Sequence, residues 1–264
     1  MIRSAWFGLV TVAATAWYST LALAGAVVRA RRGWYDRVHR GWARALLRAA
    51  GVRVEVAGLE HLAPAAPQIL VANHQSTFDI FAMFAALPVS IRFIAKRELA
   101  RIPVFAQAMR AAGHVFIDRG DRRGSVEAMR AAGARMREEG FSLGLFPEGT
   151  RSRTGALREF KKGSFVLAIE TRLPLVPVAV DGGWRLASNR GLRPGRVRIR
   201  IGPPIPTEGK TVEDRDEVLR AVRAAVERLL AEGRRDAGDP TPVDPEPGGG
   251  RAPGSGTPPT AGPA

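Results

Sequence analysis

The chain contains no cysteine and very little lysine. The absence of cysteine excludes disulfide bonds, thiolate zinc sites and a cysteine nucleophile. Lysine is so scarce that arginine supplies nearly all of the 40 basic side chains, which outnumber the 25 acidic ones. The four histidines, at positions 39, 61, 74 and 114, do not follow a metal-ligand spacing. We therefore expect no bound metal ion.

The excess of basic side chains limits the kinds of partner. A formal net charge of +15 attracts anions such as lipid headgroups, phosphorylated ligands or nucleic acid. Nucleic acid binding is the non-enzymatic alternative, but the sequence has no helix-turn-helix, zinc-finger or aromatic RNA-binding signature. We therefore expect an anionic lipid or phosphorylated partner and no nucleic acid.

A long uncharged segment lies near the amino terminus. Residues 4–28 contain no charged side chain, and a helix of that length covers about 37 Å, enough to cross a hydrocarbon core. Residues 34–50 repeat apolar side chains at helical spacing with arginines between them, as in helices that lie on anionic membranes. We predict that residues 1–50 form a membrane-associated helical hairpin, with the phospholipid surface as a partner.

Other interpretations of this region stay open. The uncharged segment can span the bilayer, or it can lie within one leaflet. Residues 22–24 resemble a signal-peptide cleavage site, so the segment can also be a secretory signal. The second segment can equally be an ordinary surface helix that covers the core.

Short apolar runs alternate with longer helical patterns between residues 51 and 235. The expected strands are residues 52–56, 68–72, 91–95, 115–117, 143–146, 175–180 and 197–201. The expected helices are residues 77–86, 104–112, 123–139, 164–170 and 213–232. This alternation predicts one α/β domain, with a mostly parallel central sheet flanked by helices.

Proline marks two further features of this organisation. Pro177 interrupts the strand expected at 175–180, and proline cannot donate to a sheet, so we expect that strand at an edge or with a bulge. Residues 236–264 are rich in proline and glycine with few apolar anchors. We expect them to form a disordered tail.

The segment 73–79 (Asn-His-Gln-Ser-Thr-Phe-Asp) predicts a catalytic pair. It places an imidazole and a carboxylate five positions apart, directly after an expected strand. On one straight helix such positions point about 140° apart, so His74 and Asp79 meet only if His74 lies in the preceding loop. Histidine is suited to moving a proton near neutral pH, and a carboxylate can hold its ring. The alternative is that His74 is a turn residue and Asp79 complements the helix dipole.

The segment 146–153 (Phe-Pro-Glu-Gly-Thr-Arg-Ser-Arg) predicts an anion site. Gly149 frees the backbone to approach a ligand, and Thr150 and Arg151 supply hydroxyl and guanidinium donors. Glu148 is expected to hold Arg151 or to accept a hydrogen bond from a ligand hydroxyl. A polar surface hairpin is the alternative interpretation.

Three more cations are candidates for anion contacts. Arg119 ends the segment 113–119 (Gly-His-Val-Phe-Ile-Asp-Arg), and its planar guanidinium matches phosphate oxygens. Lys161 and Lys162 are candidates for a secondary anion contact. In parallel sheets ligands bind at the carboxyl ends of strands, so we expect His74, Arg119 and Glu148 at one rim.

These segments, in this order, resemble the four sequence blocks of the glycerolipid acyltransferases, in particular the 1-acylglycerol-3-phosphate acyltransferases. The family's His-x4-Asp block matches His74 and Asp79, and its Gly-x-x-Phe-x-x-Arg block matches residues 113–119. Its Phe-Pro-Glu-Gly-Thr-Arg-Ser block matches residues 146–152, and its Val-Pro-Val block matches residues 176–178. The resemblance covers roughly residues 50–205, and the amino-terminal hairpin is similar to the membrane-docking element of bacterial members.

The resemblance implies a reaction and a place for it. A fatty acyl group would pass from acyl-CoA or acyl-carrier protein to the sn-2 hydroxyl of 1-acylglycerol 3-phosphate (lysophosphatidate), giving phosphatidic acid in phospholipid biosynthesis. No bound cofactor is implied, because the thioester is a substrate. The implied location is the inner or plasma membrane of the cell, with the active site on the cytoplasmic side.

The resemblance also implies residue roles. His74 and Asp79 would be catalytic. The acceptor's phosphate and glycerol would bind Arg119, Glu148, Gly149, Thr150 and Arg151. Another acceptor, such as glycerol 3-phosphate, a lyso-ornithine lipid or another lysolipid, is the alternative. Ser76 as an acyl-accepting nucleophile is disfavoured, because no Gly-x-Ser-x-Gly elbow is present.

Overall fold

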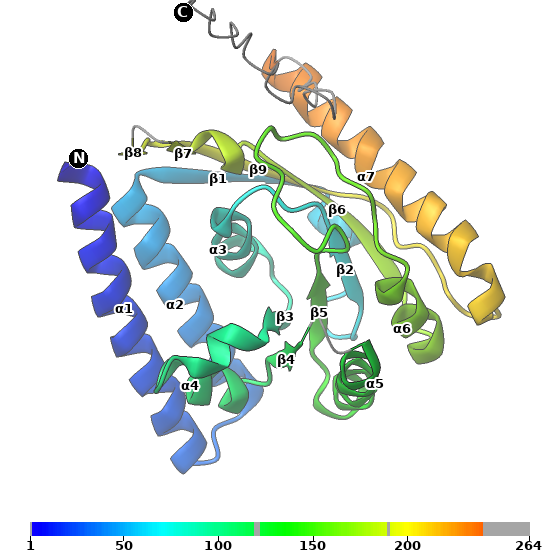
Figure 1. Cartoon of the computed structure of the whole chain (residues 1–264), viewed down its shortest axis with the longest axis horizontal. Coiled ribbons are helices and arrows are strands. Elements are labelled where there is room, and N and C mark those ends of the chain that lie inside the picture. Colours follow the sequence, from blue (N-terminus) through cyan, green and yellow to red (C-terminus); the bar gives the residue numbers. More distant parts are fainter. Residues whose placement is uncertain (1, 119–121, 189–190, 240–264) are drawn as a thin grey trace, which may run out of the picture.

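Figure 1 shows the computed structural model, which describes residues 2–118, 122–188 and 191–239. A seven-stranded sheet in the order β1-β9-β6-β2-β5-β3-β4 forms its centre. Neighbouring strands of this sheet are parallel except for β6 and β9. The predicted α/β fold with a mostly parallel central sheet is therefore confirmed.

The elements follow one another much as the sequence pattern predicts. The strands are β1 (Val52–Ala57), β2 (Ile69–Ala72), β3 (Ile91–Lys96), β4 (Val115–Ile117), β5 (Ser142–Leu145), β6 (Leu175–Asp181), β7 (Ala187–Ser188), β8 (Gly191–Leu192) and β9 (Gly195–Ile201). The α-helices are α1 (Ile2–Val27), α2 (Arg32–Ala50), α3 (Thr77–Ala86), α4 (Phe105–Ala111), α5 (Arg122–Glu139), α6 (Gly163–Thr171) and α7 (Arg215–Ala237). Short 3-10 turns are η1 (Leu59–His61), η2 (Arg97–Arg101), η3 (Gly183–Arg185) and η4 (Val212–Asp214).

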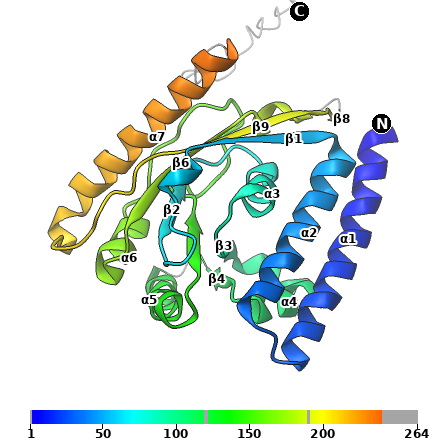
Figure 2. The ribbon, with the colours of Figure 1, turned by 180° about the vertical axis from the view of Figure 1, so that it is seen from behind.

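Helices cover both faces of the sheet, as the front and back views show (Figures 1 and 2). Because side chains alternate along a strand, Leu70 and Ala72 face the core formed with α2 and α3, while Ile69 and Val71 face α6 and α7. All four residues are fully buried. Burial on both faces explains why these strands read as continuous apolar runs.

Pro177 lies in the interior of the sheet and not at an edge. It is opposite Val71 on β2, and β6 has β9 on its other side. The ladder to β9 covers Val178 to Asp181, and the Pro177 carbonyl accepts a hydrogen bond from Gly202 N just beyond it, at 2.9 Å. Of the two expected arrangements, the edge position is therefore wrong. The pairing is irregular at Pro177, because residues 176–177 of β6 face residues 202–204 of the neighbouring segment between the Val178–Ile201 pair and the Leu175–Ile205 bridge.

The first two helices form an antiparallel hairpin against the domain. Small side chains lie at the buried positions of α1, which are Ser19, Ala22 and Gly25. A side chain at Gly25 would collide with Trp34 of α2, whose indole N–H donates to the Leu21 carbonyl at 2.9 Å. At its other end α1 reaches β8, where Leu192 N donates to Ser4 Oγ at 3.1 Å. The hairpin is therefore packed along its length onto the folded body.

The carboxyl-terminal helix extends further than the sequence pattern predicts. The expected helix 213–232 runs to Ala237 as α7, so residues 236–239 do not belong to a disordered tail. Asp236 pairs with Arg200, and Asp239 pairs with Arg185 and Arg198. The rest of the expected tail, residues 240–264, lies outside the described residues.

Candidate active site

The loop between β2 and α3 brings His74 and Asp79 together. Asp79 is fully buried, and its Oδ2 lies 2.8 Å from His74 Nδ1. The same oxygen accepts from the backbone N–H groups of Gln75, at 2.6 Å, and Ser76, at 2.7 Å. Ser76 is the N-cap of α3, so Asp79 both caps the helix and orients the ring. With Nδ1 donating to the carboxylate, the other ring nitrogen, Nε2, is left to accept a proton.

Asp79 has room only because residue 183 is glycine. A Cβ at Gly183 would lie 2.6 Å from Asp79 Oδ1 and 3.0 Å from Ser76 Cβ. The turn η3, which follows β6, therefore packs directly against the buried carboxylate. The sequence segment 181–184 carries no signal for this role, because the contact crosses from one strand end to another.

Glu148 faces the loop between β2 and α3 (residues 73–76), which carries the expected base His74 and is termed the base loop. It does not face the cations of its own segment. Its Oε1 accepts from His74 N at 2.7 Å, and its Oε2 accepts from Arg158 N at 3.3 Å. The side chain is buried, which raises its pKa to about 7, and the nearby Asp79 charge adds to this rise. Arg151, which Glu148 was expected to hold, instead donates to Thr77 Oγ1 at 3.0 Å.

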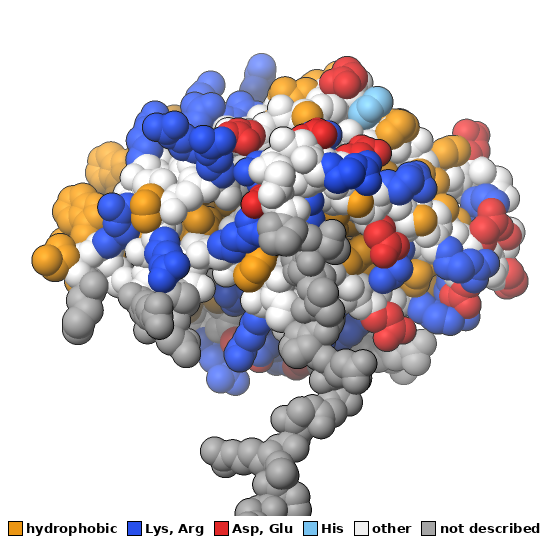
Figure 3. Space-filling model, turned by 90° about the horizontal axis from the view of Figure 1, so that it is seen from above, with side chains coloured by type: hydrophobic (Ala, Val, Ile, Leu, Met, Phe, Trp, Pro, Cys, Tyr) orange, Lys and Arg blue, Asp and Glu red, His pale blue; other side chains and the backbone are white. Residues whose placement is uncertain are grey.

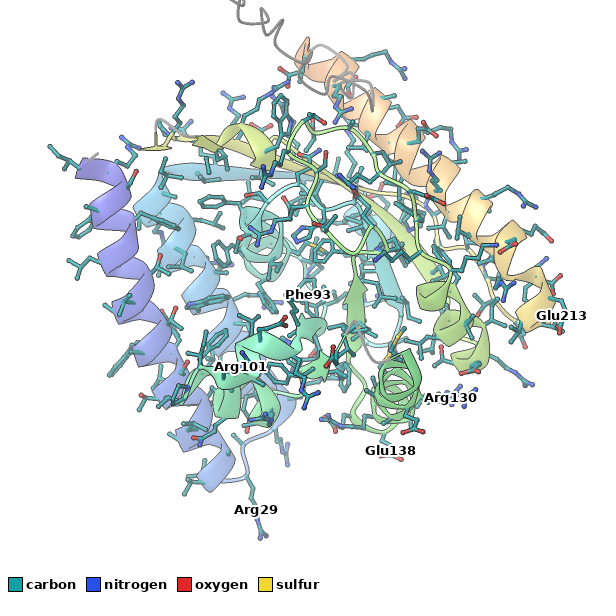
Figure 4. All side chains as sticks on the ribbon, viewed as in Figure 1. Arg29, Phe93, Arg101, Arg130, Glu138 and Glu213 are labelled. Atoms are coloured by element: carbon teal, nitrogen blue, oxygen red, sulfur yellow. The ribbon has the colours of Figure 1, made fainter. Side chains whose placement is uncertain are left out.

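The His74 ring lies on a row of aromatic side chains. Phe146 stacks on it with ring centroids 4.1 Å apart, and Phe93 stacks on Phe146 at 5.6 Å. Phe93, labelled in Figure 4, occupies the space above Gly144, where a Cβ would lie 2.3 Å from the ring. The row sets the tilt of the imidazole and leads from it into an apolar cavity.

A buried network ties the base loop to the end of α7. Gln75 Nε2 donates to Asp181 Oδ1 at 3.0 Å and to the Gly155 carbonyl at 3.2 Å. Arg234 of α7 donates to both Asp181 oxygens at 3.1 Å and to the same Gly155 carbonyl at 2.7 Å. Asp181 and Arg234 are both buried. This network connects the two segments that carry the expected base and the expected anion site, and the sequence pattern did not predict it.

A cavity of about 1110 Å³ opens beside His74. Its apolar part lies between α1, α2, α3, α4 and β3, with Trp42, Phe81, Phe84, Phe93 and Phe105 among its walls. Thr150, Arg151 and Lys161 also line it, and a Cβ at Gly149 would lie 3.0 Å from Lys161 Nζ. The cavity therefore combines apolar walls, which suit an aliphatic chain, with cations that line it together with His74.

Of the other predicted cations, Lys162 lies in the described part of the chain. Lys162 pairs with Asp216 of α7 at 2.8 Å and is not among the cavity walls, whereas Lys161 is. Arg119 lies outside the described residues. Lys96, at the end of β3, lines the cavity and pairs with Glu98 at 2.5 Å, although the sequence pattern did not single it out.

Two other histidines in the cavity wall are unsuited to be bases. His114 Nε2 lies 3.1 Å from His39 Nε2, and His114 Nδ1 receives the Phe93 N–H at 3.1 Å. Burial lowers the pKa of His114 to about 3 and lowers that of His39 well below its usual value, with Arg92 contributing to both. Within the described ranges, no three His, Asp or Glu side chains lie close enough to share a metal ion.

The sequence and the fold are similar to those of acyltransferases. The sequence profile of the family described as Acyltransferase matches residues 53–181. The mouse 1-acyl-sn-glycerol-3-phosphate acyltransferase alpha is 34% identical over 185 residues, which are 69% of this chain and 65% of the relative. The chain thus spans just under two thirds of the mouse relative's length. The 1-acyl-sn-glycerol-3-phosphate acyltransferase of Limnanthes douglasii is 32% identical over 88% of this chain and 83% of its own length.

A solved structure matches the fold over most of its length. The crystal structure of the 1-acyl-sn-glycerophosphate (LPA) acyltransferase PlsC from Thermotoga maritima superposes with a TM-score of 0.76 at 27% sequence identity. The match covers 88% of this chain and 95% of that structure. The two chains therefore share one fold over nearly the whole of the solved structure.

Proposed function

Since this chain belongs to the 1-acyl-sn-glycerol-3-phosphate acyltransferase family, we propose that it acylates lysophosphatidate. The acyl group comes from the thioester of acyl-CoA or acyl-carrier protein and passes to the sn-2 hydroxyl, giving phosphatidic acid. The observation that carries the proposal is the 2.8 Å contact between His74 Nδ1 and buried Asp79, beside a cavity with apolar walls and cations. The His74–Asp79 pair can activate an alcohol, the cations can bind a phosphate, and the apolar walls can bind a fatty chain.

His74 is the proposed general base. An alcohol is a weak nucleophile at neutral pH, so His74 Nε2 takes the hydroxyl proton as the oxygen attacks the thioester carbonyl. The tetrahedral intermediate then expels the thiolate, which recovers the proton from the imidazolium. Asp79 holds the tautomer and stabilises the imidazolium. No bound cofactor takes part in these steps.

The acceptor's phosphate is proposed to bind near the segment 149–151. In lysophosphatidate only one carbon and one ester oxygen separate the reacting sn-2 carbon from the phosphate, so cations must lie close to His74. Arg151 and Lys161, with Thr150 and Gly149, line the same cavity as His74, which supports the proposal. Arg119 is proposed as a further phosphate ligand on its sequence block alone. Glu148 acts indirectly, by holding the backbone of His74.

The helix α1 is proposed to lie in one leaflet at the cytoplasmic side of the cell membrane. By length and composition it is apolar enough to cross a membrane. Its packing onto α2 and its hydrogen bond to β8 favour a helix that remains packed against the protein over one that leaves it to span the bilayer. In Figure 3 hydrophobic side chains gather at the edge where α1 begins, while acidic and basic side chains alternate on the opposite side.

Thiol release from acyl-CoA, measured with and without lysophosphatidate, tests the function. Membranes that contain the protein should release thiol in an acceptor-dependent manner, and mass spectrometry should detect phosphatidic acid. Parallel assays with glycerol 3-phosphate and a lyso-ornithine lipid separate the alternative acceptors, and acyl-carrier protein separates the donors. Absence of turnover with every acceptor, or turnover that His74→Ala leaves intact, contradicts the proposal.

A further inference from the structure

The segment that joins β3 to α4 exposes apolar side chains beside the cavity. Leu99 is 38% exposed, Ile102 is 48% exposed and Val104 is 44% exposed, all within six consecutive positions. Leu99 and Ile102 also line the cavity, as does Phe105 at the start of α4. The same apolar segment therefore has one side toward the surroundings and one toward the cavity, as an opening for a hydrophobic ligand requires.

The backbone of this segment is strained at Val104. Its φ of 60° and ψ of −55° lie in a region that β-branched residues avoid, and Phe105 N hydrogen-bonds to the Pro103 carbonyl across it. This tight turn holds the Val104 side chain in its exposed position. Strained backbone of this kind is concentrated at functional sites.

The exposed segment lies next to α1 through the packing of α4. Helix α4 packs on the hairpin, with Ala108 and Ala112 joining Ala22 of α1 in one buried cluster. On its outer side α1 exposes Trp17 at 60% and Val27 at 84%. Figures 1 and 2 both place α4 against the lower part of the α1–α2 hairpin. The exposed segment thus directly precedes a helix that packs on α1.

Cations lie next to the exposed apolar side chains along the chain. Arg97 and Arg101 lie in η2, and Arg101 is labelled beside α4 in Figure 4, with Arg29 at the turn of the hairpin below it. Exposed apolar side chains within a border of arginine match a bilayer with anionic headgroups. Acyl-carrier protein, which the proposed function allows as a donor, would cover these apolar side chains only while it is bound. A bilayer that holds α1 covers them continuously.

We propose that residues 99–104 insert into the bilayer beside α1 and form the opening through which lipid chains pass between the leaflet and the cavity. This inference rests on the proposed acyl transfer. It adds a second membrane contact to that of α1, located at the mouth of the cavity. A chain entering there moves from one apolar medium to another without crossing water, which avoids the cost of exposing it.

The absence of cysteine allows a direct test. Single-cysteine variants of the full-length chain, Ile102→Cys, Leu9→Cys on the exposed face of α1 and Leu59→Cys on η1, are labelled with an environment-sensitive fluorophore. Vesicles of phosphatidylethanolamine and phosphatidylglycerol are then added, with and without nitroxide quenchers on the lipid tails. We expect a blue shift and quenching at positions 9 and 102, and a water-like spectrum at position 59.

A water-like probe at position 102 overturns the inference, whether or not the probe at position 9 enters the bilayer. Acceptor-dependent thiol release by the unlabelled wild-type chain is measured separately, so the proposed function can survive that result. If the wild-type chain releases no thiol with any acceptor, the proposed function fails independently of the fluorescence.

A kinetic comparison tests the role of the opening. Val104→Asp places a charge in the exposed segment without altering the cavity walls, and Leu59→Asp is the matched control. We expect Val104→Asp to lower kcat/KM about tenfold with long-chain lysophosphatidate in vesicles. Its kcat/KM should stay at the wild-type value with a short-chain lysophosphatidate dissolved as monomers. Equal losses on both substrates, or no loss on vesicles, overturn the proposed passage.

Discussion

The backbone N–H of His74 donates a hydrogen bond to Glu148 Oε1 at 2.7 Å, which joins the base loop to the expected anion segment. A second hydrogen bond, from Ser152 N to the His74 carbonyl at 2.8 Å, reinforces the junction. His74 therefore has its ring held by Asp79 and its backbone held by the segment 148–152. The distance between the proposed base and the proposed phosphate ligands is set by these contacts, so changes at either segment should affect both.

The proposed base should be indispensable. We expect His74→Ala to lower kcat by about 10²- to 10⁴-fold, because general-base catalysis contributes an effect of that size. Asp79→Asn should cause a loss of similar order, since the amide cannot hold the same tautomer and also accept from two backbone N–H groups. Acceptor-dependent thiol release gives both rates. Turnover near the wild-type rate in His74→Ala removes His74 from its role.

The two adjacent lysines should behave differently. Arg151→Ala and Lys161→Ala should raise KM for lysophosphatidate about tenfold or more, because a charge-assisted hydrogen bond contributes about 1.5–3 kcal/mol. Lys162→Ala is the matched control, since Lys162 pairs with Asp216 away from the cavity and its loss should leave KM unchanged. Initial rates against acceptor concentration measure the three values. An equal effect at positions 161 and 162 contradicts the assignment.

Gly183 should tolerate no side chain. The Cβ of Gly183→Ala would lie 2.6 Å from Asp79 Oδ1, so the carboxylate must move and the His74 ring with it. We expect kcat to fall about 10²-fold with little change in KM, as for small misplacements of reacting groups. Gly163→Ala is the control, because nothing lies within 4 Å of its Cβ. Unchanged kcat in Gly183→Ala shows that Asp79 does not need its present position.

Removing the guanidinium of Arg234 should loosen the base loop. Arg234→Met leaves Asp181 buried without its ionic partner, and breaking such a pair costs about 3–5 kcal/mol. We expect a lower thermal midpoint and a lower kcat. The neighbouring exposed residue provides the control: Arg235→Met should change stability by less than about 0.5 kcal/mol. If Arg234→Met matches that control in stability and kcat, the network does not support the loop.

Glu148 should make stability depend on pH. Its pKa is about 7 in the folded protein against an ordinary 4.5, so between these values the folded chain keeps a proton that the unfolded chain has lost. The contribution of Glu148 to the free energy of unfolding is therefore largest below about pH 4.5. It falls as the pH rises toward 7 and is constant above about pH 7. Glu148→Gln cannot titrate. The thermal midpoint of the wild type relative to this variant should fall over the same interval, and a difference that stays constant or rises contradicts the assignment.

The helices and strands were largely predictable from sequence, because their signals are local. The limits of α3 coincide with the predicted residues 77–86, since Ser76 and Asp79 form a capping box within one turn. The alternation of Leu70 and Ala72 with Ile69 and Val71 was less informative, because both faces of a central strand are buried. The edge position expected for Pro177 was wrong for a related reason, because the residues of a strand do not specify which strands lie beside it in the sheet.

The candidate site likewise has features that the sequence predicted and features that it did not. The sequence by itself determined that an imidazole and a carboxylate follow one strand, that a glycine-containing cationic turn follows another, and that both strands belong to one parallel sheet. Only the tertiary structure decided that Glu148 holds the backbone of His74, that Gly183 makes room for Asp79, and that Arg234 braces Gln75 through Asp181. Local propensities act over a few residues, whereas these contacts join residues up to 106 positions apart, and folding alone brings them together.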